Sequence, residues 1–378
     1  MLTEAGCEMK NKYKNQSTIL FDGKFIRLLL ESITTIVFAL LLISNAASQS
    51  RKDFKLENIT VKAGEKGTGF VEVPNGVDEG TQIPVSIFHG IGEGKVFVIM
   101  SGLHGSEYAP ILGVQRLAKQ LNPKKLNGTI ILIHIANLPS FLKRTVYYGM
   151  DGKNLNRVFP GKSDGTITER IAHILIEKII KRGDFLIDVH SGDNNESLRP
   201  YVVYYDAPTV ERAKVEVSRQ MAFAFGIDFI KRTQIPELDY NKSNYGTRAA
   251  LASGLAVMAV ESGQLGKPEE IAIDRVEKGL LSVLRAMKFI EGKPIQTKNP
   301  TILKRDHTVR AKQTGLFYSL VNLSQKVKKD QLLGYVTDYF GNKIEEAKAP
   351  FEGVVMYFTA TPPVSVGEPL VNIGEFDR

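Results

Sequence analysis

Four runs of almost uninterrupted apolar residues recur along the chain, at 95–101, 129–135, 185–189 and 255–260. Helices are predicted at 110–121, 167–180, 207–225 and 268–290, and apolar residues recur at helical spacing in the first two. Strands that are apolar on both faces and alternate with helices indicate a parallel or mixed sheet covered on both sides. The main domain is therefore predicted to be α/β.

The C-terminal part of the chain has a different character. The segment 294–300, rich in Pro, Lys and Thr, is predicted to link the main α/β domain at 51–293 to a β-rich domain at 301–378. This last region contains short β-rich pieces and a faint repeat at an offset of 38 residues, as in Gly315 and Gly353.

Two pieces of this region, AKAPFEGVV and VSVGEPLVNIG, resemble the halves of a biotinyl/lipoyl-like barrel-sandwich domain. A swinging carrier needs a lysine at a hairpin tip between the halves. No lysine lies between Gly353 and Arg378, nor between Gly315 and Lys326. We therefore expect a structural or substrate-gating domain without a carrier cofactor.

The first fifty residues are predicted to be a leader. Ile33–Ile43 is an uncharged apolar run of about the length of a signal-peptide core, with Lys24 and Arg27 before it and small residues after it. We expect an exported protein, periplasmic or secreted, if the leader is cleaved. A retained membrane anchor and a buried helix of the folded domain are the alternatives.

Composition excludes several classes of site and partner. The single cysteine, Cys7, lies in the predicted leader, which rules out disulfides and zinc held by thiolates. Lys and Arg outnumber Asp and Glu by 49 to 41, but no basic block is interleaved with aromatic residues and the chain has no Trp. We therefore expect no nucleic-acid partner.

Four titratable residues follow the predicted strands. His104 and Glu107 come just after the first run, three residues apart at the start of a helix, so both side chains can reach one metal ion. His190 and Glu261 directly follow the third and fourth runs. Because the carboxyl ends of such strands share one edge of the sheet, we expect these residues to converge there.

Two His and one Glu, with a second Glu as base, are the composition of a hydrolytic zinc site with an open position for water. A helix-capping His and an exposed first-turn Glu are the alternative for His104 and Glu107. Asp188 shares the strand face of His190 and is either its orienting partner or an ordinary buried polar residue. Core or surface roles are expected for the other histidines, which are His89, His134, His173 and His307.

A long irregular stretch between the second and third runs carries Arg144, Asn156 and Arg157. Loops of this length in compact domains are usually functional. Guanidinium groups suit carboxylates and developing oxyanions, because they offer paired donors that keep their charge. Surface arginines on a solvated loop are the alternative.

Five motifs occur in a fixed order: HGSE, NLPSF, NLNRVFPG, DVHSG and VESG. From about residue 65 to 290 this series resembles the succinylglutamate desuccinylase/aspartoacylase family, relatives of the zinc carboxypeptidases. The resemblance implies a zinc-carboxypeptidase-like mixed sheet flanked by helices, with a small C-terminal β domain. The sequence departs from the family pattern at Asn154, where Asp is usual, and at Leu138.

The resemblance also implies roles for individual residues. One zinc ion per chain would be held by His104, Glu107 and His190, and Glu261 would be the general base and acid. Arg144 would polarise the scissile carbonyl. The residues that would hold the substrate are Asn156, Arg157 and, on a weaker match, Arg248.

The expected function is zinc-dependent hydrolysis of an amide bond in a small, carboxylate-bearing substrate such as an N-acyl amino acid. Two alternatives stay open. One is an exported metallocarboxypeptidase that acts on peptides or cell-wall stem peptides. The other is a non-catalytic ligand-binding protein on the same scaffold.

Overall fold

The computed structural model describes residues 51–147 and 151–377. The predicted leader at 1–50 lies outside the described residues, so export and membrane anchoring stay predictions. Residues 51–378 form one compact unit. Within the described part, no helix is both long enough and apolar enough to span a membrane.

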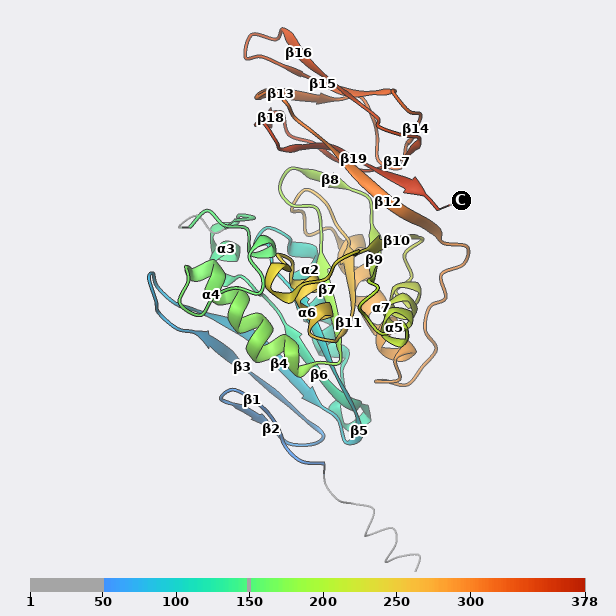
Figure 1. The fold of residues 1–378 in the computed structure, drawn as a ribbon. Coiled ribbons are helices and arrows are strands. Elements are labelled where there is room, and N and C mark those ends of the chain that lie inside the picture. Colours follow the sequence, from blue (N-terminus) through green and yellow to red (C-terminus); the bar gives the residue numbers. More distant parts are fainter. Residues whose placement is uncertain (1–50, 148–150, 378) are drawn as a thin grey trace, which may run out of the picture. The chain divides into compact units, whose positions relative to one another are not determined.

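A mixed sheet of thirteen strands organises the described unit (Figure 1). From one edge to the other its strands are β14 (Lys326–Val327), β17 (Gly353–Thr359), β19 (Pro369–Phe376), β12 (Thr301–Arg310), β10 (Phe229–Gln234), β9 (Tyr201–Asp206), β11 (Ala256–Glu261), β7 (Phe185–His190), β5 (Gly92–Ser101), β6 (Asn127–Ile133), β4 (Thr81–His89) and β3 (Glu65–Val73). The remaining strand, β8 (Glu196–Leu198), pairs with β17.

Two smaller sheets accompany it. One pairs β1 (Phe54–Leu56) with β2 (Ile59–Val61), and the other contains β16 (Lys343–Lys348), β15 (Leu332–Thr337), β13 (Gly315–Ser319) and β18 (Pro363–Val364). The central part of the large sheet is parallel, because β7 pairs in parallel with both β5 and β11. The four predicted apolar runs are confirmed as β5, β6, β7 and β11.

Helices cover both faces of this sheet, as the apolar strands require. The helices of the described unit are α2 (Tyr108–Gln120), α3 (Leu138–Lys143), α4 (Ile167–Ile174), α5 (Arg212–Ala224), α6 (Gly246–Ala252) and α7 (Glu270–Ala286). Helix α4 continues as a π-helical turn, Leu175–Ile179, and a 3-10 turn, Ile180–Arg182. Further 3-10 turns lie at Pro123–Lys125, Leu155–Arg157 and Tyr240–Lys242.

The strands divide their side chains between two cores. Phe97 and Ile99 of β5 pack with residues of α2, α5 and α7, whereas Val98 and Met100 pack with residues of α4 and α6. This alternation follows from the two-residue period of a strand. The α/β class and the mixed sheet flanked by helices, both predicted from the sequence, are confirmed.

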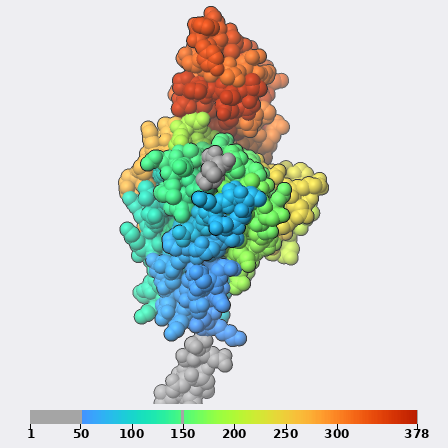
Figure 2. All heavy atoms as spheres, turned by 90° about the vertical axis from the view of Figure 1, so that its left-hand side faces the viewer, coloured from blue at the N-terminus to red at the C-terminus, as the bar shows by residue number. Residues whose placement is uncertain are grey.

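The residues after 301 form only strands in the described part, as predicted for the C-terminal region. They also extend the large sheet, because β12 pairs in parallel with β10 and antiparallel with β19. Figure 2 shows these residues, in orange to red, gathered at one end of the described unit. The pairing of β8 with β17 brings the segment after His190 to this C-terminal region. The domain boundaries at 293 and 301 stay predictions.

Candidate active site

The site lies where β5, β7 and β11 end. Gly102 closes β5 with a positive φ of 67°, and the HGSE turn follows directly. A Cβ on Gly105 would lie 2.1 Å from the carbonyl carbon of Ser140, so only glycine lets this turn pass the start of α3. Across the sheet, Glu261 is in register with His190 on the neighbouring parallel strand.

His104, Glu107 and His190 form a compact group of possible metal ligands. One ligand atom from each lies within 4.8 Å of the others. The Nδ1 atom of His104 is 2.6 Å from Oε1 of Glu107, and the Nδ1 atom of His190 is 3.0 Å from Oε2 of the same carboxylate. Glu107 precedes α2 as its N-cap, but its side chain makes no capping bond and faces the two imidazoles instead.

Each imidazole has a second partner on its far side. The Nε2 atom of His190 lies 3.1 Å from the buried carboxylate of Asp188. The Nε2 atom of His104 lies 3.1 Å from Oδ1 of Asn154, the residue that replaces the usual Asp of the family pattern. Such outer partners fix the orientation of metal-binding histidines, so this arrangement favours the orienting role of Asp188 over an ordinary buried polar residue.

Electrostatics link these three groups tightly. Burial alone would raise the pKa of Glu107, but the adjacent His104 and His190 imidazoles outweigh it and lower the pKa to about 2. Burial alone would lower the pKa of His190, but the carboxylates of Asp188 and Glu107 raise it well above its ordinary value. Two imidazole nitrogens and one carboxylate therefore face one another at short distances, an arrangement that a cation between them would stabilise.

The surroundings of Glu261 shift its pKa in the opposite direction to that of Glu107. Burial raises its pKa well above the ordinary value, the Glu107 and Glu196 carboxylates raise it further, and His190 offsets only part of this. An elevated pKa suits a carboxyl group that must accept and later release a proton near neutral pH.

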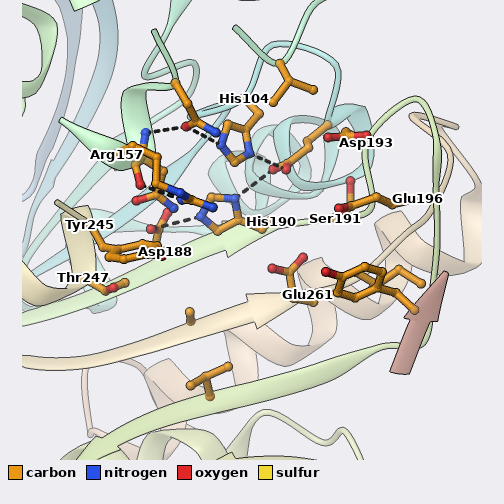
Figure 3. A pocket seen from close by; sticks show the side chains of 18 of the residues that line it. His104, Arg157, Asp188, His190, Ser191, Asp193, Glu196, Tyr245, Thr247 and Glu261 are labelled. Carbon is orange, nitrogen blue, oxygen red and sulfur yellow. Dashed lines mark hydrogen bonds and ion pairs between the residues drawn. The ribbon is translucent and has the colours of Figure 1, made fainter. Parts of the chain in front are cut away.

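A cavity of about 550 Å³ contains these groups and most of the other predicted site residues. Figure 3 shows His104, His190 and Glu261 near its centre, with Arg157 and Tyr245 to one side. Asn156, Arg157 and Arg248 all line the cavity. The guanidinium groups of Arg157 and Arg248 lie 4.6 and 4.8 Å from the ring centroid of Tyr245, so both positive charges gather at one place.

Asn156 is held by the backbone, because its Oδ1 accepts a hydrogen bond from the N–H of Gly246 at the start of α6.

Arg144 is placed differently from the other predicted residues. It ends α3 in a left-handed conformation, is exposed, and does not line the cavity, although Val146 and Tyr147 of the same segment do. Its role at the scissile carbonyl stays a prediction.

Several cavity residues were not identified from the sequence. Asp193 and Glu196 lie on the loop and strand that follow His190, and Arg310 and Tyr357 belong to the C-terminal strands. Asp193 and Glu196 could have been found from the sequence, because they follow the predicted ligand His190 by three and six residues. Arg310 and Tyr357 had no such signal, since long-range pairings of β12 with β10 and of β17 with β8 bring their strands to the site.

The remaining histidines have structural partners or lie outside the cavity. His89 is hydrogen-bonded to Thr129 Oγ1 at 2.8 Å and to the carbonyl oxygen of Lys52, and His134 is hydrogen-bonded to the hydroxyl of Ser86. None of His89, His134, His173 and His307 lines the cavity.

Replacing Asp188 by Asn is expected to weaken metal affinity by about 10–100-fold, because the amide is a poorer acceptor for the Nε2–H of His190. Competition with a chromophoric chelator measures this. Asp164→Asn, at an exposed carboxylate, is the control and should leave the affinity unchanged. Equal affinities for Asp188→Asn and the control would contradict the orienting role.

Comparison with known proteins identifies the family of this chain. Residues 93–287 match the model of the succinylglutamate desuccinylase/aspartoacylase catalytic domain. The chain is similar to the N-alpha-acetyl-L-2,4-diaminobutyric acid deacetylase of Halomonas elongata, with 28% identity over 81% of this chain and 91% of that protein. It is 22% identical to the succinylglutamate desuccinylase of Pseudomonas aeruginosa over 50% of this chain and 57% of that protein.

Solved structures share the fold. A succinylglutamate desuccinylase/aspartoacylase from Rhodobacter sphaeroides aligns with a TM-score of 0.74 and 21% identity, over 87% of this chain and all of that one (100%). The product-bound ectoine utilization protein of Ruegeria pomeroyi aligns with a TM-score of 0.74 and 23% identity, over 84% of this chain and 98% of that one. Together with the family match, these findings confirm the resemblance seen in the motifs. This chain belongs to the succinylglutamate desuccinylase/aspartoacylase family.

Proposed function

We propose that this protein is a zinc-dependent deacylase that hydrolyses the amide bond of a small N-acyl amino acid. The observation that carries the proposal is the convergence of His104, Glu107 and His190, with Glu261 in the same cavity. Family membership supports it, and two relatives are named for N-acylated amino acids.

The three candidate ligands suit zinc. Two imidazole nitrogens and one carboxylate make up a common catalytic zinc site, which keeps a further position open. Both Nδ1 atoms already face the Glu107 carboxylate, so these three groups could bind one cation. When bound, zinc would lower the pKa of water and polarise the scissile carbonyl.

Glu261 would move the proton. Its carboxylate accepts a proton from the attacking water while the water oxygen forms a bond to the amide carbon. The carboxyl then donates that proton to the amide nitrogen as the C–N bond breaks, which releases a carboxylic acid and a free amine. The raised pKa of Glu261 helps it to hold the proton between the two steps.

Arg157 and Arg248 would bind the carboxylate of the amino acid, and Asn156 would orient it. The two guanidinium groups gather around Tyr245 on one side of the candidate ligands, which supports a common anion-binding role. For Arg144 the proposed role at the scissile carbonyl requires its exposed side chain to turn toward the cavity.

A substrate panel tests the proposal. We expect the zinc-loaded protein to release amino acid from N-acetyl and N-succinyl amino acids, and a chelator to abolish this release. The C-terminal residues Arg310, Tyr357 and Pro369 line the same cavity, which favours small substrates over peptides. Faster removal of C-terminal residues from peptides would instead indicate a carboxypeptidase. Bound zinc without any hydrolysis would indicate a binding protein.

A further inference from the structure

Tyr201, at the start of β9, has no role in the proposed reaction. It lies in register with Glu261 across the antiparallel pairing of β9 with β11, and Glu261 lies in register with His190 on β7. Three neighbouring strands therefore present a candidate metal ligand, the proposed base and a phenol in one row. Residues directly opposite each other on antiparallel strands have Cβ atoms about 5 Å apart, so Tyr201 and Glu261 are immediate neighbours.

The side chain of Tyr201 faces the cavity. Because side chains alternate along a strand, Tyr201 shares one face of β9 with Val203 and Tyr205, and all three line the cavity. Val202 and Tyr204 point to the other face, where they pack in the core that contains residues of α5 and α7. Tyr201 therefore belongs to the wall of the cavity.

The phenol of Tyr201 is available to a bound molecule. Among residues 51–147 and 151–377, no group is hydrogen-bonded to it, whereas the phenol of Tyr357 is bonded to Thr308 Oγ1 at 3.2 Å and that of Tyr205 to the side chain of Thr247. Burial raises the pKa of Tyr201 well above its ordinary value, and the neighbouring carboxyl group raises it further. The phenol therefore keeps its proton at neutral pH and remains a hydrogen-bond donor.

Amide hydrolysis requires such a donor. The carbonyl oxygen of the scissile amide gains negative charge when water adds to the carbon, and preorganised donors at this oxygen lower the barrier. Arg144 is exposed and does not line the cavity. Arg157 and Tyr245 lie to one side of the candidate ligands (Figure 3), and Arg248 lies over the same ring. These two arginines are thus grouped at the proposed carboxylate end, whereas Tyr201 is in register with the base.

We propose that Tyr201 is a further catalytic residue, whose phenol donates a hydrogen bond to the carbonyl oxygen of the scissile amide. This inference rests on the proposed deacylase function and adds a residue to its site. The phenol keeps its proton throughout, and its hydrogen bond becomes stronger as negative charge develops on the oxygen. The neighbouring Glu261 carries the proton that moves from the water to the amine.

The test removes the hydroxyl and keeps the ring. With the N-acyl amino acid that the zinc-loaded wild type hydrolyses fastest, we expect Tyr201→Phe to lower kcat by roughly 10²-fold, with KM within about threefold of the wild type and the same zinc content. Tyr204→Phe, on the same strand but facing away from the cavity, is the matched control and should keep the wild-type kcat.

A tetrahedral analogue gives a readout that does not depend on turnover. In a phosphinate analogue of the same substrate, a tetrahedral phosphorus carries a charged oxygen in place of the carbonyl oxygen. By calorimetry this analogue should bind Tyr201→Phe roughly 10²-fold more weakly than the wild type, and the free amino acid should bind both alike. A loss of mere packing would not separate these two ligands.

Three outcomes would contradict the inference and leave the deacylase intact. The first is a Tyr201→Phe protein whose kcat and analogue affinity stay within about threefold of the wild type. The second is a raised KM at unchanged kcat, which would make Tyr201 a binding residue. The third is a loss of kcat in Arg144→Gln but not in Tyr201→Phe, which would assign the carbonyl oxygen to Arg144. Hydrolysis of no N-acyl amino acid by the zinc-loaded wild type would overturn the proposed function, and this inference with it.

Discussion

Replacing Glu261 by Gln is expected to lower kcat by roughly 10²–10⁴-fold while the zinc content stays unchanged. The amide of glutamine keeps the size of the side chain but cannot accept a proton from the attacking water. Glu261 is not one of the three residues whose ligand atoms cluster, so its loss removes a proton carrier and leaves the donor set in place.

Single-turnover hydrolysis of an N-acyl amino acid and elemental analysis of the same sample separate the two effects. Loss of zinc along with activity would make Glu261 a ligand rather than a base. Activity within a few-fold of the wild type, with zinc bound, would remove Glu261 from the mechanism and point to another carboxyl in the cavity.

Replacing His190 by Ala is expected to reduce both activity and stability. The change removes one nitrogen donor and leaves two buried carboxylates, Asp188 and Glu107, without the imidazole that lies 3.1 and 3.0 Å from them. Breaking a buried ion pair on one side destabilises a protein by about 3–5 kcal/mol, so we expect a lower melting temperature as well as hydrolysis near background.

His307→Ala is the matched control, because His307 is exposed on β12 and does not line the cavity. It should keep both the melting temperature and the activity of the wild type. A His190→Ala protein with unchanged hydrolysis would contradict the metal-binding role, whatever its stability.

The central strands could be predicted because burial on both faces demands apolar side chains throughout. The run KVFVIMS, for example, became the end of β5, with Phe97 and Ile99 in one core and Val98 and Met100 in the other. The peripheral strands lack this signal. β3 is an edge strand with mostly exposed or half-buried residues, and β4 contains Pro84, which weakens a strand pattern.

The extension of the sheet beyond residue 301 could not be read from the sequence. β12 pairs with β10 through residues about seventy positions away, and nothing local in either strand specifies that partner. The same holds for β8 and β17, whose pairing joins the loop after His190 to the C-terminal strands.

The convergence of His104, Glu107, His190 and Glu261 could be predicted, because parallel strands bring their carboxyl ends to one edge. Residues contributed by loops were harder to assign. Arg157 lines the cavity, whereas Arg144 is exposed at the end of α3, and no periodicity distinguishes two loop arginines. Asn154 shows how an apparent departure from a family pattern can keep a function, since its amide oxygen accepts from His104 as a carboxylate would.

The zinc content of the full-length protein, measured by elemental analysis for the wild type, His104→Ala and His307→Ala, shows whether the chain holds zinc through His104. We expect about one zinc ion per chain in the wild type and in His307→Ala, and little in His104→Ala. Wild-type protein that remains metal-free after exposure to excess zinc would contradict this expectation, as would equal zinc content in all three proteins.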